Sequence, residues 1–195
     1  MYNLTQYLIK LISVLNIDNT SVSVSADFNN RHVGTDKTIS GSISGASSGN
    51  YNLTNISNSN INVLNITGYS QDKVYDRLTT ASVDLPDVLI IDGSVTADAN
   101  FSNKDVSSNV TVSGSLVGSN ASNYTVAFTT ANITKKPLTA VAGDKVYNSS
   151  TNTSFTLYGV IASDNVSAEV TYNTANVWIN KPSSASVAGP DSNNY

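Results

Sequence analysis

The sequence repeats itself at a long and nearly constant interval, and this interval constrains the fold more than any other feature. Lys73 opens the phrase KVYDRLTTA, and Lys145 opens the similar phrase KVYNSSTNT. When the chain is shifted so that Ser21 falls on Ser94, SVSVSADFNN coincides with SVTADANFSN. A period long enough for a small domain indicates a series of like structural units, each of which contacts mainly its neighbours.

Within the repeat, apolar residues alternate with Ser, Thr and Asn. Alternation of this kind places every second side chain of a β-strand on a buried face. It predicts that Phe28 and Phe101, which coincide under the shift, are large inward-facing anchors of successive units. A third, looser copy places WINK at Trp178 opposite FSNK at Phe101, which makes Trp178 the third anchor.

Short apolar runs separated by Gly, Asn, Asp and Ser predict many short strands and no useful helix. We therefore expect an all-β chain of tandem small antiparallel β-sandwich-like repeat modules in a rod, with a β-grasp-like module as the alternative. The strands expected in the middle copy are 66–75, 79–85, 88–91, 94–101, 109–116 and 123–134.

The repeat divides the chain into three predicted domains: a front-truncated repeat over 1–65, a complete repeat over 66–134 and a back-truncated repeat over 135–195. The chain is thus expected to be a fragment of a longer protein. No Gly/Ser-rich linker separates the copies, and Pro137 stiffens the second joint. The opening segment, 1–17, is interpreted as strands of an incomplete repeat, because it lacks the features of a signal peptide.

Composition excludes several classes of protein. Ser, Thr and Asn form about two fifths of the chain, but 39% is hydrophobic and the net charge is only −4, which favours a folded chain over a disordered one. The low charge and a pI near 4.7 argue against nucleic-acid binding. There is no Cys for disulfides or metal, and no apolar run long enough for membrane insertion.

The residues that could carry chemistry are few. His32 is the only histidine, and no Gly-x-Ser-x-Gly elbow or metal-binding spacing accompanies it, so no enzyme activity and no cofactor are expected. Asp72 with Asp76, and Asp84 with Asp87, could be paired carboxylates or calcium ligands. No Asp-x-Asp-x-Asp-Gly loop is present, and the interpretation as turn-forming residues is preferred.

Five tyrosines recur in equivalent positions of the copies. They could stack on sugars, but recurrence favours packing, with each hydroxyl bonded to backbone. The predicted structural repeat positions are Phe28, Tyr51, Lys73, Tyr75, Asp76, Phe101, Tyr124, Lys145, Tyr147, Asn148 and Trp178, with Tyr195 as the fifth recurring tyrosine.

The phrases KVYD, FSNK, VSG, NYT and ANITKKPLT, in this order, resemble the YDG-type repeats of bacterial filamentous-haemagglutinin-like surface adhesins. The resemblance covers nearly the whole chain. The family's Tyr-Asp-Gly reads Tyr75-Asp76-Arg77 in one copy and Tyr147-Asn148-Ser149 in the next, so the turn lacks its glycine. The resemblance implies a bacterial protein that is secreted or attached to the cell surface.

The leading hypothesis is a non-enzymatic structural spacer in the stalk of an exported adhesin, whose partners are the neighbouring repeats of the same chain. The alternative is an adhesive module that binds host glycan or protein through exposed loops. Ice or mineral binding is disfavoured, because no regular Thr-x-Thr ladder repeats at short spacing.

Overall fold

The structure is a computed structural model, and it describes residues 21–54 and 56–195. The expectation for segment 1–17 lies outside this range. Strands account for 45% of the described residues and helix for 7%, so the prediction of an all-β chain with small antiparallel sheets is confirmed for this part of the chain. The helices of the described residues are short 3-10 turns. The described residues therefore contain no α-helix of the kind that a β-grasp-like module packs against its sheet.

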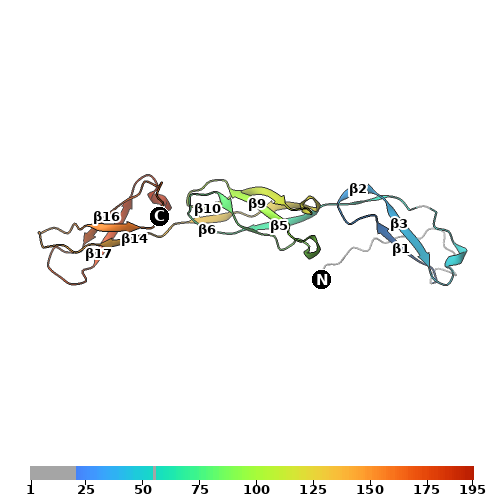
Figure 1. Ribbon diagram of the computed structural model, residues 1–195, viewed down its shortest axis with the longest axis horizontal. Coiled ribbons are helices and arrows are strands. Elements are labelled where there is room, and N and C mark those ends of the chain that lie inside the picture. The colour runs from blue at the N-terminus through green and yellow to red at the C-terminus, as the bar shows by residue number, and fades with distance from the viewer. Residues whose placement is uncertain (1–20, 55) are drawn as a thin grey trace. The chain divides into compact units, whose positions relative to one another are not determined.

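The chain divides into two compact units, which are described separately. Unit 1 comprises residues 1–65 and 119–125. Two antiparallel pairs, β1 with β3 and β2 with β4, form its sheets (Figure 1). Its elements are β1 (Ser23–Phe28), β2 (Gly34–Lys37), β3 (Ile39–Ser44), η1 (Ser48–Asn50), β4 (Ser59–Ile61) and η3 (Ala121–Asn123). Two further strands, β5 (Leu64–Ser70) and β12 (Tyr124–Phe128), begin in unit 1 and end in unit 2.

Unit 2 comprises residues 66–118 and 126–195. Its sheets have the orders β10-β13-β6, β11-β9-β7, β14-β15 and β16-β17, while β8 pairs with β5. Its elements are β6 (Lys73–Val74), β7 (Thr80–Ala81), β8 (Val83–Asp84), η2 (Ile90–Asp92), β9 (Thr96–Phe101), β10 (Ser107–Val110), β11 (Val112–Val117), β13 (Ala131–Thr134), β14 (Thr139–Ala142), β15 (Phe155–Tyr158), β16 (Ser167–Tyr172), β17 (Ser183–Ala188) and η4 (Ser192–Asn194).

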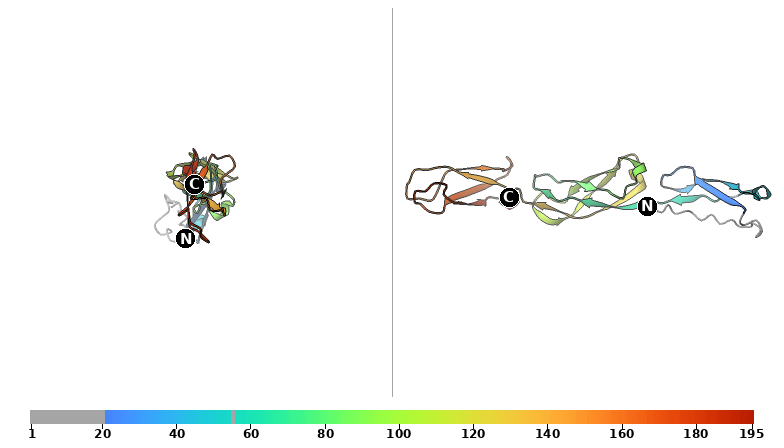
Figure 2. Two further views of the ribbon diagram at one scale, coloured as in Figure 1. Left: turned by 90° about the vertical axis from the view of Figure 1, so that its left-hand side faces the viewer. Right: turned by 90° about the horizontal axis from the view of Figure 1, so that it is seen from below.

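One antiparallel strand pair recurs three times with the same register. The pairs β1–β3, β9–β11 and β16–β17 each match six residues to six. Figure 1 labels both strands of the first and third pairs, and Figure 2 shows the same chain from two other sides. Along β1 and β9 the burial alternates as the sequence predicts, with Ser, Thr and Asp outside. The last residue of the first strand stands opposite the first residue of the second in each pair: Phe28 opposite Ile39, Phe101 opposite Val112, and Tyr172 opposite Ser183.

A glycine with positive φ follows the second strand of each of these pairs. Gly45, Gly118 and Gly189 have φ of 108°, 132° and 113°. A Cβ at Gly118 would lie 2.7 Å from the carbonyl oxygen of Ser94, so both the conformation and the space require glycine there. The sequence comparison aligns the first two of these glycines, and the structure adds the third.

The matching strand position in residues 135–195 is Tyr172, not Trp178. Trp178 is 75% exposed and lies in a loop, so the expectation that it is an inward-facing anchor is wrong. The WINK match places the anchor too late in the chain, because an exposed loop in this part of the sequence happens to resemble FSNK. Phe101 is buried at 3% exposure, and Phe28 is half-buried.

The core of unit 2 is built almost entirely from the middle of the chain. Ile133 and Tyr75 are its most deeply buried large side chains. One core residue, Tyr195, comes from the last segment and packs against the others. The cluster consists of Tyr75, Ala99, Phe101, Val110, Val112, Ala131, Ile133 and Tyr195.

The strand expected at 88–91 is a 3-10 turn instead. The side chain of Ile90 is 100% exposed and that of Ile91 is 71% exposed, so neither is buried as a strand interior would be. The backbone N–H of Asp92 donates to the carbonyl of Leu89, which closes the turn. A short aliphatic run does not by itself distinguish a strand from a turn.

Candidate functional site

His32 lies among polar residues in the part of the chain that the structure describes. His32 is exposed, and its Nδ1 lies 3.3 Å from Nδ2 of Asn123, while its own N–H donates to Asn30 Oδ1. Over residues 21–54 and 56–195, no three His, Cys, Asp or Glu side chains come close enough to hold a metal ion. His32 is thus one side of a polar contact with an asparagine.

Two of the carboxylates singled out in the sequence, Asp72 and Asp76, accept backbone N–H groups, and Asp84 accepts the side-chain amide of Gln71 at 2.8 Å. Asp76 accepts the N–H of Leu78 at 2.9 Å and pairs with Lys73 Nζ at 2.7 Å, as a turn-forming residue does. Burial opposes ionisation of Asp76, but the Lys73 hydrogen bond and the Leu78 N–H together lower its pKa. Asp72 accepts both the backbone N–H and the side-chain amide of Asn132, which lowers the pKa of Asp72.

Two equivalent lysines hold two equivalent turns. Lys73 Nζ donates to the carbonyls of Leu78 and Thr80 at 3.0 and 3.2 Å. Lys145 Nζ donates to the carbonyls of Ser150 and Asn152 at 2.7 and 2.8 Å. The residues in the glycine position of the Tyr-Asp-Gly turn, Arg77 and Ser149, have φ of 71° and 64°. The turn therefore keeps the left-handed conformation that glycine would adopt without strain.

A polar cluster surrounds Tyr195, and we call it the joint: Tyr75, Arg77, Asp164, Asn194 and Tyr195. The ring of Tyr195 packs edge-on against that of Tyr75, with centroids 5.7 Å apart. Its hydroxyl donates to Asp164 Oδ2 at 2.5 Å and accepts the N–H of Ile161 at 3.0 Å. Because Tyr75 belongs to 66–134 and Tyr195 to 135–195, the joint connects two predicted domains inside unit 2.

Asp164 is the buried charge of the joint. Its side chain has no exposed surface, and its second oxygen, Oδ1, lies 3.2 Å from Nε of Arg77. The Tyr195 hydroxyl bonds to one oxygen of this buried carboxylate and Arg77 balances its charge, whereas Oδ1 accepts no hydrogen bond from the described residues. Removal of Arg77 would leave the buried carboxylate without its opposite charge, whereas removal of the Tyr195 hydroxyl would cost the carboxylate its hydrogen bond.

The Tyr75 hydroxyl is also buried, and it has no hydrogen-bond partner among the described residues. Burial first, and then the neighbouring Asp164 carboxylate, raise the pKa of Tyr75 to about 12. Burial likewise raises the pKa of Tyr195. Both tyrosines are neutral near pH 7, where the joint contains a single ion pair.

Asn194 adds two hydrogen bonds to the joint. Its Oδ1 accepts the backbone N–H of Val106 at 2.9 Å, and its Nδ2 donates to Asp105 Oδ1 at 3.2 Å. In unit 1 the same pair of bonds recurs. Asn123 Oδ1 accepts the N–H of Val33 at 3.1 Å, and Asn123 Nδ2 lies 3.3 Å from His32 Nδ1. The shift that aligns the first two copies maps His32 onto Asp105. The asparagine side-chain amide therefore has a histidine as its partner in one copy and an aspartate in the other.

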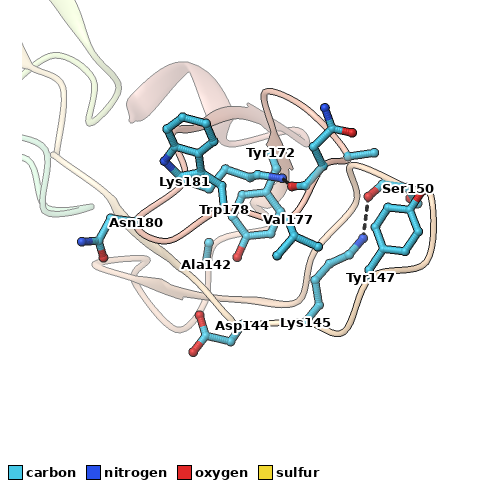
Figure 3. A pocket seen from close by; sticks show the side chains of 12 residues that line it. Ala142, Asp144, Lys145, Tyr147, Ser150, Tyr172, Val177, Trp178, Asn180 and Lys181 are labelled. Carbon is cyan, nitrogen blue, oxygen red and sulfur yellow. Dashed lines mark hydrogen bonds between the residues drawn. The ribbon is translucent and has the colours of Figure 1, made fainter.

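The last segment also contains an open cavity of about 440 Å³. Figure 3 shows Trp178, Val177 and Lys181 on one side of it and Tyr147 with Lys145 on another. Tyr147 is 58% exposed, which corrects the expectation that it is packed like Tyr75. Its hydroxyl accepts a hydrogen bond from Ser149 Oγ at 3.2 Å, so its partner is a side chain rather than the expected backbone group.

The other predicted repeat positions are distributed between packing and turns. Tyr124 is buried at 6% exposure and Tyr51 is half-buried. Asn148 Oδ1 accepts the N–H of Ser150 at 3.2 Å, as Asp76 does in its own turn. Sequence reasoning missed Asp164 and Asn194. The only available signal for Asn194 was that Asn precedes Tyr in each copy.

Comparisons with protein-family models, with curated proteins and with solved structures found no match for this chain. None of the helices in the described part of the chain has the length and apolar character needed to cross a membrane.

Proposed function

We propose that this chain is a non-enzymatic structural spacer from the stalk of an exported bacterial adhesin, made of tandem β modules over 1–65, 66–134 and 135–195. One observation carries the proposal: the bond pair from Asn194 to Val106 and Asp105 recurs from Asn123 to Val33 and His32. A contact that is repeated between successive copies is what a linear array of modules requires.

The chemistry of the joint favours a mechanical role. Tyr195 and Asp164 are both buried, and their polar atoms bond to the chain itself rather than pointing into a site. Lys136 N–H donates to the Asn194 carbonyl at 3.0 Å, and Lys135 Nζ donates to that of Tyr195 at 2.7 Å. The connecting segment is thereby bonded to the module that follows it, which resists bending between modules.

The turn geometry supports the family resemblance as part of the proposal. Positive φ occurs at Arg77 and Ser149, the third positions of the two Tyr-Asp/Asn-x turns. The resembled YDG-type repeats carry glycine at this position, and glycine suits positive φ best. An exported location, either secreted or on the bacterial cell surface, follows from this resemblance and belongs to the same proposal.

Small-angle X-ray scattering of the whole chain tests the spacer. We expect the pair-distance distribution of a rod, with a short peak for the cross-section and a long tail. The Asn194→Ala variant should broaden the tail by loosening the joint, whereas the Asn193→Ala variant at the exposed neighbouring position should not. A compact, symmetrical distribution for the unmodified chain would refute the proposal.

A second candidate is an adhesive module that binds host glycan or protein. The observation in its favour is the pair of exposed apolar side chains at the cavity, where Val177 and Trp178 are 83% and 75% exposed. Apolar and aromatic groups in a cavity are typical of ligand sites. Screening of the whole chain on a glycan array, with Trp178→Ala as the comparison, would support this role if binding is found and is lost in the variant.

A further inference from the structure

The cavity in residues 135–195, the last segment, corresponds to a position that a β-strand occupies in residues 66–134, the middle segment. There, β13 lies between β10 and β6, antiparallel to the first and parallel to the second. Ile133 stands opposite Lys73 on one side and Ser107 on the other. Ala131 and Ile133 are 4% and 2% exposed, so this strand fills the centre of the core.

Asn132, the polar residue between them, forms hydrogen bonds with residues on both sides of the strand. Its N–H and Nδ2 donate to the two oxygens of Asp72 at 2.6 and 3.0 Å. Its Oδ1 accepts the N–H of Asn109, at 2.9 Å, and Asn109 has φ of 53°. In unit 1 the arrangement recurs: the N–H of Asp36, at φ 50°, donates to Asn60 Oδ1 at 2.8 Å.

The last segment has counterparts of the residues that flank β13 in the middle segment. Lys145 makes the two carbonyl bonds that Lys73 makes, and Asn180 has φ of 53°, as Asn109 does. The register of β16–β17 repeats that of β9–β11, which places residues 177–181 where β10 stands. The repeated KVY phrase places Lys145 where β6 begins. Asp144 lines the cavity at the position that corresponds to Asp72.

In the described part of the chain, no strand lies between 145–147 and 177–181 as β13 lies between β6 and β10. Neither 145–147 nor 177–181 forms a strand, and no hydrogen bond of the Asn180 N–H is found within residues 21–54 and 56–195. Side chains that the strand covers in the middle segment are exposed here. Tyr147 is 58% exposed, against 1% for the equivalent Tyr75.

We propose that this cavity is an acceptor slot for an extended β-strand of the pattern Ala-Asn-Ile-Thr, supplied by a further repeat of the same type. The strand would run parallel to 145–147 and antiparallel to 177–181. Its asparagine would donate to Asp144 and accept the Asn180 N–H, while its alanine and isoleucine would enter the core. Strand addition of this kind combines backbone hydrogen bonds with side-chain pockets that give specificity. The inference rests on the repeat organisation of the proposed function, but not on the role in adhesion.

The chain supplies both the probe and the reporter. The probe is a capped synthetic peptide, TTANITKK, with the sequence of residues 129–136. The reporter is Trp178, the single tryptophan, which lines the slot and is now exposed. Titration of the whole chain with the peptide should shift Trp178 emission to shorter wavelength in a saturable way. Amide shifts in NMR spectra should cluster at 145–147 and 177–181.

Two controls test the recognition of asparagine. A peptide with Asn132→Leu and a chain with Asp144→Ala should each bind about tenfold more weakly, because a charge-assisted hydrogen bond is lost. The chain variant Asp87→Ala, which changes an exposed carboxylate outside the slot, should bind the unaltered peptide as the parent chain does.

The inference is overturned if millimolar peptide changes neither the emission nor the amide shifts, or if an Ile133→Asp peptide binds equally well. It is also overturned if an oligosaccharide, but not the peptide, saturates the site, since the cavity would then be a glycan site. Failure of the peptide to bind would leave the rod-like scattering expected of the spacer unaffected. A compact scattering profile would refute the spacer and would leave peptide binding unaffected.

Discussion

Replacement of Tyr195 by phenylalanine tests whether the joint stabilises the protein through one hydroxyl group. The change keeps the ring that packs on Tyr75 but removes the bonds to Asp164 Oδ2 and to the Ile161 N–H. A hydrogen bond to a charged group contributes about 1.5–3 kcal/mol, and a neutral one about 1 kcal/mol. Arg77 still pairs with Asp164 and offsets part of the loss. We therefore expect unit 2 to lose about 2–4 kcal/mol of unfolding free energy.

Hydrogen exchange measured by NMR is the assay suited to this change. The Ile161 amide donates directly to the Tyr195 hydroxyl, so its protection should fall in the Tyr195→Phe variant more than that of amides in the β9–β11 pair. Urea unfolding followed by circular dichroism gives the total loss. An amide-resolved method also separates local opening at the joint from global unfolding.

The matched control is Tyr158→Phe, because the Tyr158 side chain is 57% exposed. This variant should unfold within about 0.5 kcal/mol of the parent chain, as surface substitutions usually do. If the Tyr195→Phe variant were equally close to the parent, and Ile161 kept its protection, the hydroxyl would not stabilise the joint and the reasoning would be refuted.

Three further predictions concern single residues of the turns and core. Ser149→Gly should raise the unfolding free energy by about 0.5–1 kcal/mol in urea, because it relieves a φ of 64°, whereas Ser149→Ala should bring no gain. Lys73→Met should cost about 1–3 kcal/mol by the same measurement, because two carbonyls and Asp76 lose their donor; Lys104→Met, at an exposed pair, should cost little. Because the pKa of Tyr75 is raised to about 12 from an ordinary value of 10, its contribution to stability is complete below pH 10 and is lost as pH rises through about 12. Alkaline unfolding curves should show this loss, and a Tyr75→Phe variant with an unchanged curve would contradict it.

Local sequence patterns predicted part of the fold correctly, and the exceptions have physical explanations. Alternation located β1 and β9, because the side-chain period of a strand is two and one face is buried. The same reasoning failed at 88–91, where exposed Ile90 and Ile91 form a turn. It also failed at Trp178, where matching letters suggested a core position that the strand register assigns to Tyr172.

The sequence by itself determined the repeat, the faces of its strands and the positions of its turns, since these depend on residues within one strand or turn of one another. Only the tertiary structure decided that Asn194 meets Val106, 88 residues away, and that Tyr195 meets Asp164, 31 residues away. It also decided that Tyr147 is exposed while its counterpart Tyr75 is buried. A residue's burial depends on which distant strand covers it, and a local period contains no information about that neighbour.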